Sequence, residues 1–187
     1  MRPYSLALFI HVVGAVALVG GSVLLPLLVG AARRAPSVAG LRTVAAILHP
    51  MGRVVQIAAP LTLLAGLYMA FAADWWRMAW PFVALAAFAV AGVVSNRFEK
   101  VTGAAWEQVV AAPDGPVPPD VTAMLESRFV TLVSRHMIAI DVAIVFLMTA
   151  KPGLWASLAS FAVTNGLAVA VARQRPGVTA ADALATV

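Results

Sequence analysis

A chain of 187 residues that is 62% hydrophobic and only 11% charged is too apolar for a soluble globular protein, in which about 45–50% of residues are apolar and ~25% charged. The absence of cysteine excludes disulfides, thiolate catalysis and metal sites held by cysteine. The formal net charge of +5 suggests no nucleic-acid ligand, because the basic residues flank long apolar runs as they do in membrane proteins. The composition therefore predicts a polytopic membrane protein.

Five apolar segments predict five membrane-spanning helices, at 4–31, 52–73, 79–96, 136–150 and 154–172. About 20 apolar residues span a bilayer, and backbone groups inside it must satisfy their hydrogen bonds within the segment, which favours helices. The first run is longer than the apolar part of a signal peptide, so we expect an uncleaved first helix. The predicted fold class is all-α, with one transmembrane bundle over residues 1–173 and a loose cytoplasmic tail at 174–187.

The basic residues divide unequally between the two sides that five spans define. One side has only three of them, Arg2, Arg77 and Lys151. The other side, with a 32–51 loop, the 97–135 segment and the tail, has ten: Arg33, Arg34, Arg42, Arg53, Arg97, Lys100, Arg128, Arg135, Arg173 and Arg175. Because basic loops stay in the cytoplasm, the N-terminus is predicted outside and the C-terminus in the cytoplasm.

The longest connection, 97–135, has apolar residues at helical spacing on both sides of the turn-forming sequence APDGPVPPD (112–120). This pattern predicts a cytoplasmic helical hairpin that extends the third and fourth spans. Such a hairpin offers a surface on which a soluble partner can dock.

His11 is an ionisable side chain inside the first apolar run, and such residues mark functional sites because they are costly to bury in a bilayer. It shares a helical face with Gly14 and Gly21, small residues that allow a helix or a flat ligand to approach closely. His11 is therefore a candidate ligand of haem or of a metal ion. A histidine that is hydrogen-bonded across the bundle is the alternative.

Three methionines near the outer ends of other spans are candidate partners of His11: Met69, Met78 and Met148. Haem iron accepts ligation by histidine and methionine, and Cu(I) prefers soft thioether and imidazole ligands. Methionine also fills gaps in apolar packing, which is the alternative for each of them. Met148 is the preferred second haem ligand, because it shares a helical face with Asp141 and Val145.

His49 and His136 begin the second and fourth spans on the cytoplasmic side, so they lie across the membrane from His11. Together they could bracket a metal ion or a second cofactor near the inner surface. Two interfacial histidines without a ligand are the alternative.

Asp141 lies inside the fourth span and needs a partner, since burying it costs about 2.5–3.5 kcal/mol on insertion scales. Arg53 and Arg97, at the inner ends of the second and third spans, could form an ion pair with it that joins helices. The alternative is a proton or ion relay that includes Gln56.

Three segments carry a resemblance to a known family: LFIHVVGAVALVGG (8–21), RVVQIAAPLTLLAGLYM (53–69) and RHMIAIDVAIVFLMTAKPG (135–153). The chain resembles a bacterial integral-membrane family of unknown function, related to the group that includes copper-resistance protein D and the HemJ-type protoporphyrinogen oxidases. The resemblance covers most of the chain through residue 153. It implies a helical bundle in the bacterial inner membrane, with His11 as a ligand of haem b. HemJ-like proteins use a lysine early in the third span, and the matching region, WWRMAWPFVALAAF (75–88), contains none.

The expected function is that of an inner-membrane b-type haem protein in electron transfer or oxidoreduction, with a redox partner. The likeness to copper-resistance proteins implies an alternative, a transporter of copper, another metal or a small solute. A further alternative is a non-catalytic subunit of a membrane complex, whose 97–135 hairpin docks a cytoplasmic partner. A homo-oligomer is compatible with all three.

Overall fold

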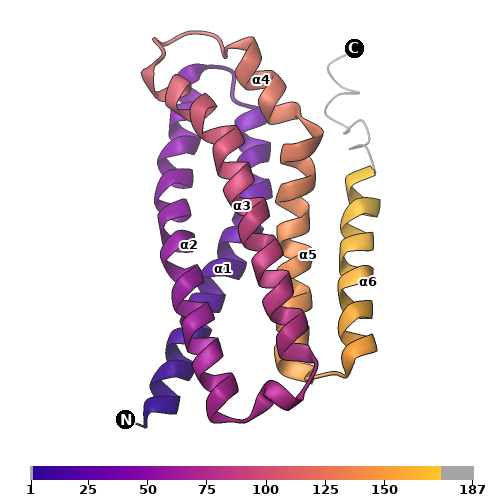
Figure 1. The fold of residues 1–187 in the computed structure, drawn as a ribbon. Helices are drawn as coiled ribbons and strands as arrows, with labels where there is room; N and C mark the ends of the chain where they lie inside the picture. The colour runs from indigo at the N-terminus through magenta and orange to yellow at the C-terminus, as the bar shows by residue number, and fades with distance from the viewer. Residues whose placement is uncertain (1, 174–187) are drawn as a thin grey trace.

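The computed structural model describes residues 2–173, and nearly all of them are helical (Figure 1). The helices are α1 (Pro3–Arg33), α2 (Val38–Ala72), α3 (Trp80–Ala111), α4 (Pro119–Glu126), α5 (Arg128–Ala150) and α6 (Leu154–Arg173), with a 3₁₀ turn, η1 (Trp75–Arg77). The described part of the chain contains no strand, which confirms the all-α fold class. The tail predicted at 174–187 lies outside the described residues.

Five of these helices, α1, α2, α3, α5 and α6, are long and apolar enough to cross a membrane, as predicted. The prediction of a loop over 32–51 is wrong, because α2 already begins at Val38 and only residues 34–37 connect it to α1. The Ser37 hydroxyl caps this start by accepting a hydrogen bond from the Gly40 N–H. The segment lacks the apolar character of a span, yet Val38, Leu41 and Ala45 recur at helical spacing and are buried.

Four helices form the body of the bundle, and each packs against two neighbours in the order α1, α2, α3, α5 and back to α1. Within residues 2–173 the diagonal pairs, α1 with α3 and α2 with α5, do not pack together. Helix α6 packs against α5 and, less extensively, α3. Consecutive long helices run in opposite directions (Figure 1). We call the end that holds the N-terminus and η1 the His11 end, and the opposite end, with the 34–37 and 112–118 connections, the Trp106 end.

Helices α1, α2 and α3 are longer than a bilayer is thick. They have 31, 35 and 32 residues, or about 46–53 Å at ~1.5 Å per residue, against a hydrocarbon thickness of ~30 Å. The cationic side chains Arg33, Arg34, Arg42 and Arg128 lie at the Trp106 end, so we expect the extra length to extend beyond the bilayer there. We call the part of α1, α2, α3 and α4 at this end the cap.

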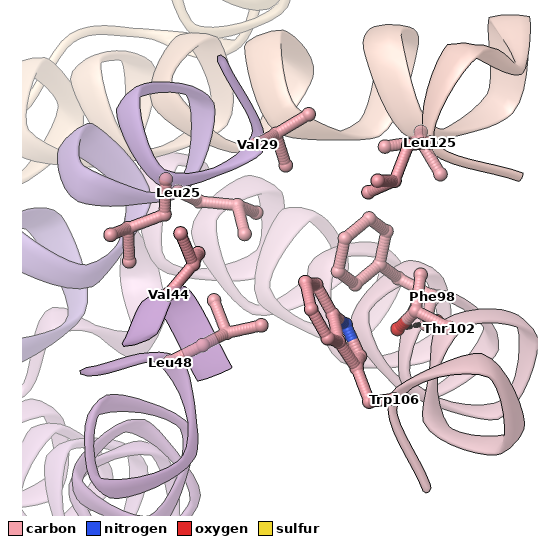
Figure 2. Close-up of a pocket in the computed structure, with 10 residues that line it drawn as sticks. Leu25, Val29, Val44, Leu48, Phe98, Thr102, Trp106 and Leu125 are labelled. Atoms are coloured by element: carbon pink, nitrogen blue, oxygen red, sulfur yellow. Dashed lines mark hydrogen bonds between the residues drawn. The ribbon is translucent and has the colours of Figure 1, made fainter. Parts of the chain in front are cut away.

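The cap has its own hydrophobic core, which includes Trp106 at 6% exposure. The core contains Ala32, Val38, Leu41, Ala45, Trp106, Val109, Val121 and Leu125. Figure 2 shows Trp106 and Phe98 facing Leu48 and Leu125 across a cavity of about 10 Å³. The cavity walls are almost entirely apolar, so a water molecule would lack the two to four polar partners it needs.

Inside the membrane, α1 and α2 approach closely because α1 has glycine where it meets α2. A Cβ atom on Gly14 would lie 2.0 Å from Thr62 Oγ1, and one on Gly21 would lie 2.6 Å from Val55 Cγ2. Both glycines are buried, and their spacing of seven residues keeps them on one helical face. The predicted face of small residues is thus the contact surface with α2, and it brings His11 against the α2 backbone.

Candidate functional site

His11 lies where α1, α2 and α5 come together at the His11 end, and it is only 8% exposed. Its Nδ1 lies 2.8 Å from the backbone carbonyl oxygen of Thr62 on α2. Its Nε2 lies 3.2 Å from Met148 Sδ on α5. The structure thus brings together His11 and Met148, which the sequence singled out, from positions far apart in the chain.

The hydrogen bond to Thr62 determines which nitrogen of His11 is available to a ligand. A carbonyl oxygen only accepts, so Nδ1 carries the proton and donates it. In the neutral ring, Nε2 then keeps its lone pair, which is directed at a thioether sulfur that is itself an acceptor. The neutral site therefore presents two electron-pair donors that face each other.

Gly66 on α2 makes room for the imidazole ring. A Cβ atom at this position would lie 2.9 Å from His11 Cε1 and 3.1 Å from Nδ1. Thr62 and Gly66 were not identified from the sequence, although a signal exists: Ala58, Thr62, Ala65 and Gly66 are small residues at helical spacing on α2. Gly66 and the Thr62 carbonyl are the parts of this face that meet the ring.

Met148 is held in place by a second hydrophobic cluster at the His11 end. It packs against Trp80, Ala84 and Leu147, which belong to α3 and α5 and are buried. Beside this cluster, Lys151 Nζ lies 4.3 Å from the centre of the Trp75 ring, where α5 turns towards α6. These contacts fix the end of α5 that carries the sulfur.

The other two methionines occupy different surroundings. Met69 is buried on the face of α2 that holds Gly66, about one turn nearer the His11 end. Met78 is exposed, and its sulfur accepts a hydrogen bond from Trp80 Nε1 at 3.4 Å. Met69 therefore lies about one turn from the glycine that meets the His11 ring, whereas the sulfur of Met78 already accepts a hydrogen bond.

His49 and His136 are not brought together, so the paired site suggested for them does not form. They lie on α2 and α5, which occupy diagonal positions in the bundle and do not pack together. His49 is exposed and donates from Nδ1 to the Ala45 carbonyl of its own helix at 3.0 Å. His136 is half-buried, and its Nδ1 has no hydrogen-bond partner. Within residues 2–173, no three or more His, Asp or Glu side chains gather as a metal site.

The expected ion pairs of Asp141 with Arg53 or Arg97 are also absent from the described residues, and this prediction is wrong. Arg53 is exposed on α2, which does not pack on α5. Ser95 on α3 contacts Met137 on α5, and because the two helices are antiparallel, Arg97 and Asp141 lie on opposite sides of that level, about 9 Å apart along the bundle.

Gln56 does not join a relay with Asp141. Its Nε2 donates to Glu99 Oε1 at 2.8 Å, and both side chains are exposed. Asp141 itself is half-buried, and its Oδ2 has no hydrogen-bond partner. None of the three predicted partners, Arg53, Arg97 and Gln56, therefore contacts the Asp141 carboxyl group.

The distance between His11 Nε2 and Met148 Sδ can be compared with the ligand spacing that each of the two suggested cofactors requires. Metal bonds to imidazole nitrogen and to sulfur are about 2.0 and 2.3 Å long. Two axial ligands on opposite faces of a haem would therefore lie about 4.3 Å apart, and these donors are 3.2 Å apart. The site does not fit a haem between them. The same separation allows both donors to bind one small ion, with an angle of about 95° at the metal.

No protein-family model, curated protein or solved structure matches the chain. The resemblance to the copper-resistance and HemJ-type group therefore remains an expectation from the quoted motifs. Any function has to be argued from the site itself.

Proposed function

We propose that this membrane protein binds a soft metal ion, Cu(I), inside the bilayer, with His11 Nε2 and Met148 Sδ as two of its ligands. The observation that carries the proposal is the 3.2 Å approach of two electron-pair donors with no proton between them in the neutral site. Imidazole nitrogen and thioether sulfur are both ligands that Cu(I) favours.

The surrounding residues would prepare the site for this ion. The hydrogen bond from Nδ1 to Thr62 fixes the ring orientation and the tautomer, as outer partners of metal-bound histidines commonly do. Trp80 and Leu147 pack beside the methionine side chain. Met69, buried about one turn from Gly66 on the same face of α2, is the candidate for a third soft donor. All three ligands are neutral, so they would hold a monovalent ion without adding a buried anion.

Such a site fits a metal-handling protein, in which copper enters the membrane from the His11 end. His11 is about 12 Å from the start of α1, which is close enough to that surface for an ion to be loaded and deep enough to exclude bulk water. We further propose that the His11 end faces the outside of a bacterial inner membrane. The excess of basic residues at the Trp106 end supports this orientation.

Cu(I) titration of the purified protein in nanodiscs, under reducing conditions and with bicinchoninate as competitor, tests the proposal. The native protein is expected to bind one tight Cu(I) per chain. His11→Ala and Met148→Leu should weaken binding by at least ~10-fold, since each removes a donor. Met78→Leu is the matched control, because this methionine is exposed and its sulfur already accepts a hydrogen bond.

Two results would overturn the copper assignment. One is Cu(I) affinity that stays unchanged in both His11→Ala and Met148→Leu. The other is a Soret band in native protein produced with ample haem that disappears in His11→Ala, which would assign His11 to haem.

Gly66→Ala is expected to weaken Cu(I) binding on the order of 10-fold while the protein still folds. The added methyl group meets the His11 ring at 2.9 Å, and the ring can tilt away because it is a side chain. Tilting breaks the hydrogen bond to Thr62 and turns Nε2 away from Met148. The measurement is the same competition titration, with Gly92→Ala as control because a methyl group there meets nothing within 4 Å. Equal binding by both variants would contradict the role of Gly66.

A further inference from the structure

Asp141 is the only acidic residue in the described part of the chain that is not exposed. It lies within α5, two helical turns from Met148, at a depth where the helix crosses the membrane. Its Oδ2 is buried and has no hydrogen-bond partner. A carboxylate left in this state would be costly, so the protein must provide either a cation or a proton for it.

The residue that faces Asp141 from α1 is Ser22. Pro26 lies four residues further along α1 and has no N–H, so the Ser22 carbonyl loses its normal helical donor. Ser22 therefore combines a hydroxyl group with a backbone carbonyl that has no donor at the usual helical position. A protonated carboxyl group is the donor that such a carbonyl lacks, whereas a carboxylate is not.

The other elements packed against α5 supply no counter-charge at this level. Helix α6 has no Asp, Glu, Lys or Arg between Leu154 and Val171. On α3 the nearest basic residue along the bundle, Arg97, is exposed and displaced by about 9 Å, and α4 lies at the Trp106 end. On α1, Arg33 lies three turns away and donates to the Leu125 carbonyl and to Thr131 Oγ1. Within residues 2–173 no cation reaches Asp141, which favours a proton.

The contact between α1 and α5 carries polar groups at three levels. His11, Ser22 and Arg33 are spaced by eleven residues, or three turns, and so lie on one face of α1 about 16 Å apart. They face Met148, Asp141 and Thr131 of α5 in that order. We call these three polar levels the seam, and Asp141 lies at the middle one.

The seam is more polar on one side of Asp141 than on the other. Towards the Trp106 end, Ser134 follows on the same face of α5 after two turns, and it is buried. Its hydroxyl donates to the Thr131 carbonyl, and Thr131 Oγ1 in turn accepts from Arg33. Towards the His11 end, the next polar side chains are those of the proposed metal site.

We propose that Asp141 is a proton-binding site in the middle of the membrane. It takes up one proton from the Trp106 end and releases it to the same end. On release, the carboxyl O–H bond breaks and the proton leaves along the side of the seam that holds Ser134 and Thr131. The remaining carboxylate accepts a hydrogen bond from the Ser22 hydroxyl. On uptake, the O–H bond forms again and donates to the Ser22 carbonyl. The site does not depend on the copper site proposed above.

Labelling with dicyclohexylcarbodiimide tests the resting state, because this reagent couples to protonated carboxyl groups in apolar surroundings. In nanodiscs at neutral pH, mass spectrometry is expected to find the label on the peptide that contains Asp141, and labelling should fall as the pH rises. Asp141→Asn should abolish this label. The exposed Asp74 and Glu99 serve as internal controls and should remain unlabelled. No label on Asp141, or a label independent of pH, would overturn the proposal.

Infrared spectroscopy of the protein in nanodiscs tests release, because a protonated carboxyl group has its own C=O absorption band. Raising the pH is expected to remove one such band from the native protein, whereas Asp141→Asn should lack this band at every pH. Asn165→Ala is the control and should behave as the native protein, because it removes a half-buried polar side chain of α6 that bonds only within its own helix. The same pH-dependent band in Asp141→Asn would overturn the proposal. If Na⁺ protected Asp141 from the carbodiimide label, the result would overturn the proton proposal in favour of a sodium site.

The two proposals fail separately in these assays. His11→Ala should lose Cu(I) binding and keep both the labelling and the carboxyl band, whereas Asp141→Asn should do the reverse. Loss of labelling in His11→Ala would contradict the independence of the two sites.

Discussion

Replacing Trp106 by alanine is expected to lower the free energy of unfolding by about 3–5 kcal/mol, the range seen when large buried aromatic side chains are truncated. The indole is 6% exposed and fills the core of the cap among Leu41, Val109 and Leu125. The substitution would enlarge the adjacent cavity (Figure 2). The helices that line this cavity continue into the bundle, so they cannot move inward to fill the space.

Far-UV circular dichroism during unfolding by SDS in mixed micelles measures the effect without relying on tryptophan fluorescence. Trp155→Ala is the matched control, since this indole is 81% exposed and its loss should change stability by less than about 0.5 kcal/mol. Equal stabilities of the two variants would show that the cap does not pack as described. The expected difference is large because the two tryptophans differ in burial and not in chemistry.

Gly14→Ala is expected to destabilise the protein by about 1–3 kcal/mol, because the new methyl group would lie 2.0 Å from Thr62 Oγ1. The nearby Ala58 carbonyl, at 3.3 Å, limits any sideways shift. Helices α1 and α2 must therefore separate, which also pulls His11 away from the Thr62 carbonyl. A loss of Cu(I) binding should accompany the loss of stability.

Gly20→Ala provides the control for this substitution on the same helix. A methyl group at Gly20 meets nothing within 4 Å, so the variant should be as stable as the native protein or slightly more stable, because alanine favours the helix. Thermal unfolding of both variants in nanodiscs gives the comparison. If Gly14→Ala unfolded at the same temperature as Gly20→Ala, the close approach of α1 and α2 would be contradicted.

The copper proposal and the proton proposal both depend on the contact between α1 and α5. Met148 and Asp141 lie on one face of α5, and His11 and Ser22 lie opposite them on α1. One polar contact would be enough to hold α1 and α5 together. This interface has two polar contacts at different depths, which is the reason to assign it a function beyond helix packing.

The membrane class, the number of candidate spans and the unusual position of His11 and Asp141 inside apolar runs follow from the sequence alone. Hydropathy acts along the chain, and an ionisable residue in a run without other charges is conspicuous wherever the helix packs. The sequence also predicts the small-residue face of α1, because its small residues recur at helical spacing within one segment. The extent of α2 was misjudged, since hydropathy detects the bilayer-spanning part of a helix and not the amphipathic part beyond it.

Only the tertiary structure decided which distant side chains meet. The sequence predicts Arg53, Arg97 and Gln56 as partners of Asp141, and His49 as a partner of His136. The residues of α2 are separated from α5 because these helices do not pack together. Arg97 is separated from Asp141 by the antiparallel register of α3 and α5. His11 and Met148 meet because glycines let α1 approach α2 while α5 packs on the other side of α1. Their 3.2 Å separation, which no pattern in the chain encodes, favours one small ion over a haem. Distances between helices are determined by side-chain packing across the bundle, whereas the sequence reports directly only on each helix and its environment.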